Sequence, residues 1–344
     1  MSVAVKISES ALTASESPSR DQDKPVVSVR SLSVEFPRLS GAPTVAVRDL
    51  DLDIRPQEVV GLVGECGAGK TTLARSLLGL PPSPGHITAG RFVFDDKDIF
   101  GLSAEGIRQV RGRDISMVVS NPRDELNPLK PVGEQIATVA RVHLGLSRRE
   151  ARQRAFDILK AVQIPDPERR MKALPHELSG GMAQRIVIAI ALVCSPRFIV
   201  SDDATSGLDV TVQAQILQLL KELILKRDSS LLFITRDIGV AAHFCDRTAI
   251  MFKGEIMEIG GRDSLFLTPR HPYTIGLMSA FCHNDRLRQV WSTQNEQIEV
   301  PAGHGGCPYA DRCPNASQTC LDQRPELKQV AEGHYVRCHY EVAR

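Results

Sequence analysis

The hydrophobic pattern of this chain alternates between short apolar runs and longer stretches with helical spacing. Residues 59–63, 198–201 and 231–235 are apolar runs rich in Val, Ile and Phe. Runs of this length and composition are typical of buried strands. Residues 210–225, between the second and third runs, repeat apolar residues at the spacing of a helix. The pattern therefore predicts an α/β core.

Other segments extend or interrupt this core. Residues 26–29, 33–36 and 45–54 carry strand patterns before the first buried run. Residues 132–142 and 149–164 have apolar residues at helical spacing and few strand signals. We therefore expect a helical insertion within the α/β core.

The chain divides into three expected regions. Residues 1–25 are Ser-rich and charged, which predicts a disordered N-terminal tail. Residues 26–260 are expected to form the α/β domain, with its helical subdomain at about 122–185. Residues 261–344, rich in Pro, Gly and Cys, are expected to form a small C-terminal extension. No segment repeats, so we expect a single copy of the α/β domain.

Composition excludes several classes of protein. The 344 residues are 42% hydrophobic and 24% charged, with a formal net charge of +1, so bulk charge favours neither nucleic acid nor an anionic membrane. The longest apolar stretch, residues 186–194, is too short to span a bilayer. The first 24 residues lack the apolar segment of a secretory signal. Any membrane contact is therefore expected to be peripheral.

A glycine-rich loop follows the run at 59–63 and precedes a predicted helix at 72–79. Its sequence fits G-x-x-x-x-G-K-T, in which backbone N–H groups surround phosphate oxygens, the Lys adds a point charge and the Thr hydroxyl ligates Mg²⁺. The alternative, a glycine-rich turn with a chance Lys-Thr, does not account for the strand before the loop and the helix after it. The expected nucleotide-binding residues are Gly64, Cys66, Gly67, Ala68, Gly69, Lys70, Thr71 and Thr72.

Later motifs decide between the many classes of phosphate-loop protein. Residues 178–185 read LSGGMAQR, residues 198–202 form an apolar run that ends in Asp202, and residues 206–209 read SGLD. In this order they resemble the signature, the Walker B strand and the D-loop of ABC ATPases. Residues 175–182, 208–215 and 270–274 are similar to the oligopeptide/dipeptide importer family, which also serves nickel and other small solutes. The resemblance covers residues 26–340 and implies a P-loop ABC ATPase fold.

The resemblance implies a role for each motif. Phe36 would stack on adenine, although a core Phe at a strand end is the alternative, and Asp202 would hold Mg²⁺ through water together with Thr71. The signature would bind the γ-phosphate of ATP held by the opposite subunit, through Leu178, Ser179, Gly180, Gly181 and Gln184.

Three positions depart from the family pattern. Ser120 stands where the family has the Q-loop Gln, Asp203 where it has the catalytic Glu, and Arg236 where it has the switch His. Ser is too short to reach Mg²⁺ and the attacking water, and Asp is one methylene shorter than Glu. Arg stays protonated and accepts no hydrogen bond, but its cation suits a γ-phosphate. We therefore expect this site to hold ATP and to hydrolyse it poorly.

Four of the eight cysteines crowd into the C-terminal extension, at Cys307, Cys313, Cys320 and Cys338. With no export signal, a metal or cluster is favoured over disulfides. Four thiolates suit zinc or an iron–sulfur cluster, and free thiols are the third possibility. The resemblance implies a 4Fe–4S cluster of structural role.

The resemblance also implies an assembly. We expect an ATPase subunit of a peptide importer, at the cytoplasmic face of the inner membrane. Its partners would be a second, catalytically complete ABC ATPase, two transmembrane permease subunits and an extracytoplasmic solute-binding protein, with no nucleic acid. The alternatives are a regulatory nucleotide sensor and a soluble ABC protein without a transport role.

Overall fold

The computed structural model of the chain describes residues 24–281 and 305–342. The expected disordered tail, residues 1–25, therefore lies almost wholly outside the described residues. In the described part of the chain, no helix is long and apolar enough to cross a membrane.

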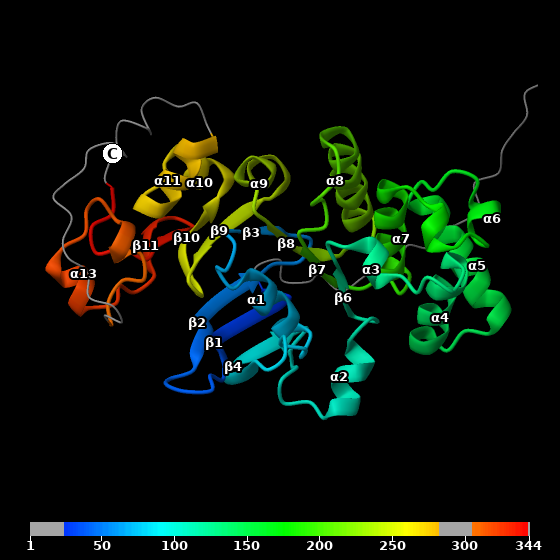
Figure 1. Cartoon of the computed structure of the whole chain (residues 1–344), viewed down its shortest axis with the longest axis horizontal. Helices are drawn as coiled ribbons and strands as arrows, with labels where there is room; N and C mark the ends of the chain where they lie inside the picture. The colour runs from blue at the N-terminus through cyan, green and yellow to red at the C-terminus, as the bar shows by residue number, and fades with distance from the viewer. Residues whose placement is uncertain (1–23, 282–304, 343–344) are drawn as a thin grey trace, which may run out of the picture.

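An eight-stranded sheet forms the centre of the molecule (Figure 1). Its order is β11-β12-β10-β9-β3-β8-β7-β6, and the strands from β9 to β6 run parallel while the others pair antiparallel. Its strands are β3 (Val59–Val63), β6 (Ile115–Val118), β7 (Phe198–Asp202), β8 (Ser230–Thr235), β9 (Arg247–Phe252), β10 (Glu255–Gly261), β11 (Lys328–Ala331) and β12 (His334–Val336). The three predicted buried runs are thus adjacent parallel strands, β3, β8 and β7.

A four-stranded antiparallel sheet covers one face of the large sheet. Its order is β2-β1-β4-β5, with strands β1 (Val27–Phe36), β2 (Thr44–Ile54), β4 (His86–Phe94) and β5 (Lys97–Asp98). Helix α1 (Lys70–Leu77) contributes Leu73 to the apolar core between the sheets, together with Phe92 of β4 and Ile234 of β8. The phosphate loop therefore emerges between two sheets that are fixed by a common core.

Helices cover the opposite face of the large sheet. The large sheet has one apolar core on each face. Successive residues of β8 point to opposite faces, so Phe233 packs in the core on the helical side and Ile234 in the core on the side of the small sheet. Both faces are buried, which explains the continuous apolar runs. The remaining helices are α2 (Ala104–Val110), α3 (Pro122–Glu125), α4 (Val132–Leu144), α5 (Arg148–Ala161), α6 (Pro167–Arg170), α7 (Gly180–Leu192), α8 (Val210–Leu225), α9 (Ile238–Phe244), α10 (Arg262–Leu267), α11 (Pro272–Phe281) and α13 (Gln318–Asp322), with 3₁₀ turns at Pro175–Glu177 and Ala310–Arg312.

The cysteine-bearing segment adds two strands to the edge of the large sheet. Strand β12 pairs with β10, with Val336 opposite Glu258, and β11 extends the same edge. Tyr309 and Cys320 belong to the same apolar core as the central helices. Helices α4 to α7 lie at the other end of the sheet (Figure 1). The sheet therefore connects the predicted helical insertion to the cysteine-bearing segment.

Candidate functional site

The phosphate loop joins β3 to α1, as its sequence predicts. Gly69 caps the start of α1 with a φ of +101°, a conformation that side chains rarely adopt. A Cβ at this position would lie 2.2 Å from the carbonyl oxygen of Ala46. Only glycine therefore lets the loop close against β2 and direct the N-terminus of α1 toward a phosphate.

Lys70 holds its ammonium inside the loop. Its Nζ donates hydrogen bonds of 2.8 Å to the carbonyl oxygens of Gly64 and Glu65, and the residue is only 8% exposed. Burial lowers the pKa of Lys70, while the carboxylates of Asp203 and Asp202 oppose that shift. The side chain thus supplies a positive charge in a partly dehydrated setting, where it attracts phosphate strongly.

Most of the predicted nucleotide-binding residues border one cleft. Asp202, at the end of β7, is hydrogen-bonded to the Thr71 side chain, and burial raises the pKa of its carboxyl. Ala46 and Ile234 also border the cleft, although no motif marks either residue. The full lining is Ala46, Cys66, Gly67, Gly69, Lys70, Thr71, Thr72, Asp202, Asp203, Ile234 and Arg236. The predicted residues Gly64 and Ala68 belong to the loop but do not line the cleft.

Asp203 and Arg236, two of the three positions that the sequence singles out, bind each other beside this cleft. Arg236 donates from Nε to Oδ2 of Asp203 at 3.2 Å, and its terminal nitrogen lies 3.1 Å from the same oxygen. The terminal nitrogen also donates to the Ser206 hydroxyl at 3.2 Å. The Asp203 carboxylate is therefore held in an ion pair with the Arg236 guanidinium.

The signature residues lie apart from this chain's own phosphate loop, and none of them lines the cleft. Ser179 is exposed and caps α7, because its hydroxyl accepts a hydrogen bond from the Met182 N–H at 3.3 Å. Leu178 is buried beneath it. A Cβ on Gly181 would lie 2.8 Å from Val212 of α8, so glycine allows these two helix starts to approach closely. The start of α7 is thus presented to the outside of the subunit.

Gln184 connects the signature helix to the predicted Q-loop. Its side chain is fully buried, and its amide donates to the carbonyl oxygen of Val119 at 3.2 Å. Ser120 follows directly and does not border the phosphate cleft. The contact with the partner's ATP that was expected of Gln184 is therefore untested, whereas its role in fixing the Q-loop backbone is visible.

Phe36 lies at the end of β1, close to Gly85. A Cβ added to Gly85 would meet the Phe36 ring at 2.7 Å, so the two residues are in tight contact. Phe36 is partly buried against the core beneath the small sheet and does not line the phosphate cleft. Its stacking on adenine stays a prediction.

The four C-terminal cysteines surround one internal cavity. Cys307, Cys313, Cys320 and Cys338 all line it, with His271 and Tyr309 among the other lining residues. All four are free thiols. Burial raises the pKa of Cys307 and Cys313 to about 11 and that of Cys338 to about 12. Burial therefore disfavours the thiolate form of these three side chains.

The chemistry of this donor set fits a metal cluster. Thiolates from separate loops are the usual ligands of iron–sulfur centres. In the described ranges, however, no three His, Cys, Asp or Glu side chains are arranged to hold a metal ion. The four cysteines thus share a cavity, but in the described part of the chain they do not form a metal-binding group.

Two regions of the chain match known protein families. Residues 47–206 match the family described as ABC transporter, and residues 257–320 match the C-terminal region of oligopeptide/dipeptide transporters. The dipeptide transport ATP-binding protein DppD of Bacillus subtilis is 41% identical over 318 residues, which cover 91% of this chain and 94% of the relative. DppD of Escherichia coli is 37% identical over 321 residues, which cover 92% of this chain and 97% of the relative.

Solved structures share the fold. A dimeric ATP-binding cassette in a post-hydrolysis state with ADP and phosphate superposes with a TM-score of 0.61 at 26% identity, covering 69% of this chain and 98% of the other. The cassette cbiO1 of Clostridium perfringens gives the same TM-score and identity, covering 77% and 98%. The expected α/β ABC ATPase fold is thereby confirmed.

Proposed function

Because this chain belongs to the ATP-binding subunits of the oligopeptide/dipeptide ABC importers, we propose that it energises peptide import as one member of an unequal ATPase pair. Its own site binds Mg-ATP and turns it over slowly. Its signature completes the site of a second, catalytically complete ATPase.

The observation that carries this proposal is the ion pair between Asp203 and Arg236. A general base must be free to accept a proton from the attacking water. The carboxylate of Asp203 is one methylene shorter than that of the family's Glu, and it is already engaged by a guanidinium that never deprotonates. The same guanidinium lines the phosphate cleft, where it can hold a γ-phosphate. Together these features favour retention of ATP over its hydrolysis.

The exposed signature supports the division of labour. Ser179 and the start of α7 do not border this chain's phosphate cleft, so we expect any ATP that they contact to be held by another subunit. The helix N-terminus offers N–H groups and a favourable dipole to that nucleotide. An intact signature beside an altered cleft is what one half of an unequal pair requires.

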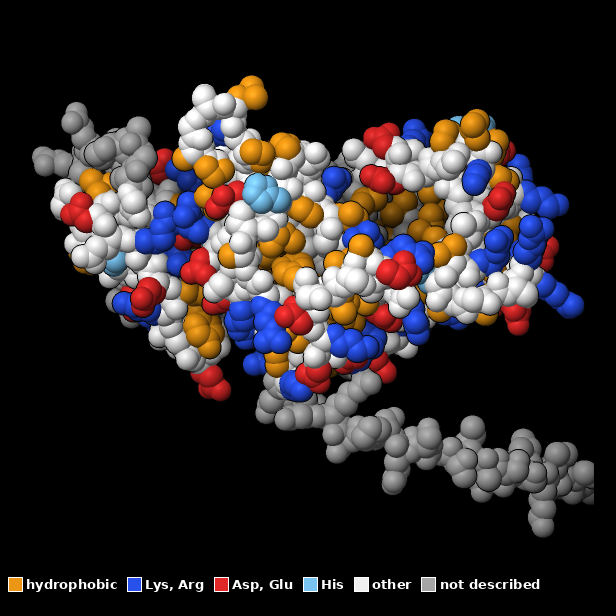
Figure 2. All heavy atoms as spheres, turned by 90° about the horizontal axis from the view of Figure 1, so that it is seen from below, with side chains coloured by type: hydrophobic (Ala, Val, Ile, Leu, Met, Phe, Trp, Pro, Cys, Tyr) orange, Lys and Arg blue, Asp and Glu red, His pale blue; other side chains and the backbone are white. Residues whose placement is uncertain are grey.

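Partners and location follow from the family. We assign two permease subunits, a second ABC ATPase and a solute-binding protein as partners, and peripheral attachment to the cytoplasmic face of the membrane. Acidic and basic side chains are interspersed on the face shown in Figure 2, in keeping with the formal net charge of +1. Co-purification with permeases tests this assignment against a soluble ABC protein or a regulatory nucleotide sensor.

The cysteine cavity would hold a 4Fe–4S cluster, with zinc as the alternative occupant. Cys307, Cys313, Cys320 and Cys338 would supply the four thiolates. The shared cavity brings the four cysteines together, and four thiolates suit a cluster or a zinc ion. When bound, the group would cross-link loops of the extension, and its role is structural.

Replacing Lys70 by Ala is expected to weaken Mg-ATP binding by at least about tenfold, because charge-assisted hydrogen bonds to phosphate are lost. Equilibrium titration of the purified chain with a fluorescent ATP analogue measures the change. Lys97→Ala, on the short exposed strand β5, is a matched control that removes a Lys outside the cleft. Equal affinities in the wild type and Lys70→Ala would reject the phosphate-loop assignment.

Restoring the family residues is expected to activate the second site. The triple variant Ser120→Gln, Asp203→Glu and Arg236→His should raise the ATPase rate of the assembled complex by up to about twofold, because a second general base becomes available. The single variant Asp203→Glu, which leaves Arg236 in place, should stay close to the wild-type rate. An unchanged rate in the triple variant would show that other features limit hydrolysis.

A further inference from the structure

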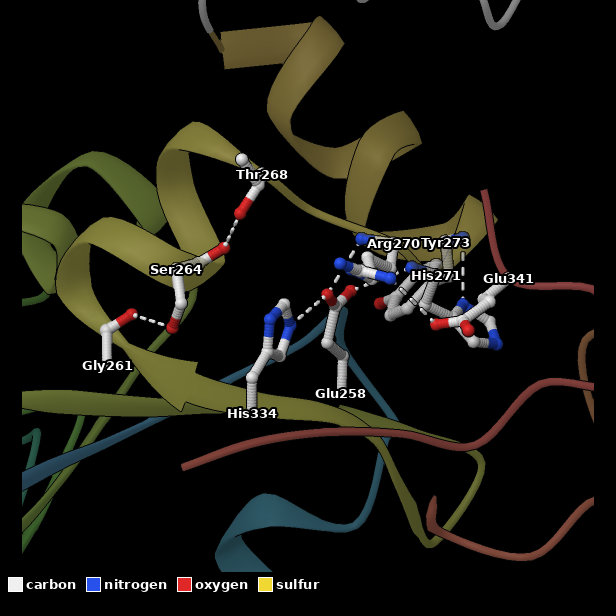
Figure 3. A network of polar contacts seen from close by, with 9 residues as sticks. All are labelled: Glu258, Gly261, Ser264, Thr268, Arg270, His271, Tyr273, His334 and Glu341. Carbon is white, nitrogen blue, oxygen red and sulfur yellow. Dashed lines mark hydrogen bonds and ion pairs between the residues drawn. The ribbon is translucent and has the colours of Figure 1, made fainter. Parts of the chain in front are cut away.

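The sequence segment Arg270–Thr274, RHPYT, has no role in the function proposed above, yet a buried network holds it firmly. Figure 3 shows Glu258 of β10 between this segment and His334 of β12. Glu258 accepts the backbone N–H groups of Arg270 and His271 at 2.8 and 2.9 Å, and His334 Nε2 lies 2.7 Å from the same carboxylate. Glu258 and His334 are essentially fully buried. The network therefore ties α11 to the strand contributed by the C-terminal extension.

The side chain of Tyr273 links this network to the phosphate loop. The backbone N–H of Tyr273 donates to Nδ1 of His271 at 3.0 Å, and the Tyr273 hydroxyl accepts the backbone N–H of Glu65 at 3.1 Å. Its ring lies 4.7 Å from the ring of Phe252 and 5.3 Å from that of Tyr309, measured between centroids. Tyr309 and His271 line the cysteine cavity. One aromatic cluster thus separates the cysteines from the second residue of the phosphate loop.

Arg312 makes a second link to the same residue. In the sequence, Arg312 stands between Cys307 and Cys313. Its guanidinium is 2.9 and 3.2 Å from the two carboxylate oxygens of Glu65. The guanidinium also stands over the Phe252 ring, 5.4 Å from its centroid. A carboxylate in a phosphate loop repels the phosphates that the loop must bind. Arg312 neutralises the charge of the Glu65 carboxylate and fixes the position of that side chain.

We propose that Arg312 and Tyr273 are positioning residues of the nucleotide site, through which the C-terminal extension sets the ATP affinity of the phosphate loop. Tyr273 fixes the backbone of Glu65, and Arg312 neutralises its side chain. The inference rests on the proposed binding of Mg-ATP at this loop. It goes beyond that function by making a segment between two cysteines part of the nucleotide site.

The test is an equilibrium titration of the full chain with Mg²⁺ and a fluorescent ATP analogue. Arg312→Ala is expected to raise Kd about two- to fivefold, the range for partly exposed ion pairs. Adding Glu65→Gln to Arg312→Ala should restore Kd to within about twofold of Glu65→Gln alone, because no unpaired carboxylate remains. A residue that only stabilised the fold would not be rescued in this way.

Three further variants separate positioning from general damage. Arg312→Lys keeps the positive charge and should bind nearly as well as the wild type. Tyr273→Phe keeps the ring but leaves the Glu65 N–H without its acceptor, and should weaken binding about two- to fivefold. Asp311→Ala is the matched control, because it removes the neighbouring exposed ion pair with Lys253 and does not touch the loop.

The outcomes are distinguishable. The positioning role is overturned if Arg312→Ala binds ATP as tightly as the wild type, or if the double variant binds as weakly as Arg312→Ala. In either case Lys70→Ala should still lose ATP binding, which keeps the nucleotide site itself intact as an assignment. Equal binding in the wild type and Lys70→Ala rejects the nucleotide site itself. A loss in Asp311→Ala as large as that in Arg312→Ala would show that any weakening of the extension has the same effect, and would also overturn the inference.

Discussion

Ser179→Arg is expected to reduce the ATPase rate of the assembled importer by about 100-fold, the scale of effect for a misplaced phosphate-binding group. Ser179 is exposed at the start of α7, and its hydroxyl caps that helix. An Arg side chain would fill the space that the partner's γ-phosphate needs and would remove the cap. Steady-state phosphate release from the reconstituted complex measures the rate.

A matched control separates the contact from the cap. Ser147 caps α5 with nearly the same backbone geometry, φ −62° and ψ 163° against −68° and 163° for Ser179, but it is not part of the signature sequence. Ser147→Arg therefore removes an equivalent cap without entering the partner's site, and most of the rate should survive.

Asp203→Asn completes the comparison. The rate of the complex should change less than about twofold, because a carboxylate already paired with Arg236 contributes little as a base. The opposite ranking, with Asp203→Asn silencing the complex and Ser179→Arg tolerated, would show that this chain's own site performs the hydrolysis.

The sequence predicts those parts of the site that local pattern determines. The apolar runs at 59–63, 198–201 and 231–235 are strands because both sheet faces are covered, and the glycine-rich loop leads into a helix as expected. The observed helix begins at Lys70, two residues before the predicted start, because Gly69 in the left-handed conformation is its cap. Local chemistry determines each of these features.

Contacts between distant segments were not predictable in the same way. The sequence marks Asp203 and Arg236 as unusual residues, but only the adjacency of β7 and β8 shows that they bind each other. Ala46 borders the cleft through its place on β2, and no motif surrounds it. The segments 328–331 and 334–336 are too short and too polar to be predicted as strands from the sequence. They become strands because β10 offers an unpaired edge.

The link between the cysteine-rich extension and the phosphate loop was also not predictable. From the sequence alone, the cysteine-rich extension lies far from Gly64–Lys70 and has no reason to affect it. In the structure, Arg312 and Tyr273 both reach Glu65. Destabilising the extension is therefore expected to lower the ATP affinity of the nucleotide site.

Replacing Cys313 or Cys338 by Ser is expected to abolish the metal content of the extension. Chain purified without oxygen should carry about four irons if a 4Fe–4S cluster is bound, and metal analysis with visible absorption measures them. Metal binding to such loops contributes directly to their folding, so the Ser variants should also expose residues 305–342 to proteolysis. Cys66→Ser, which changes an exposed thiol outside the cavity, should keep the iron.

The result distinguishes the possible occupants of the cavity. If the protein contains stoichiometric zinc and no iron, the cavity is a zinc site and not a cluster site. If it contains neither metal, the four cysteines are free thiols. If the extension acts on ATP only through Arg312 and Tyr273, the loss of ATP affinity in Cys338→Ser should not exceed the loss in the double variant Arg312→Ala, Tyr273→Phe. A much larger loss would mean that the metal site supports the phosphate loop through further contacts. The Glu258 network is the next to examine, because it joins β12 to the residues at the start of α11, the helix that carries Tyr273.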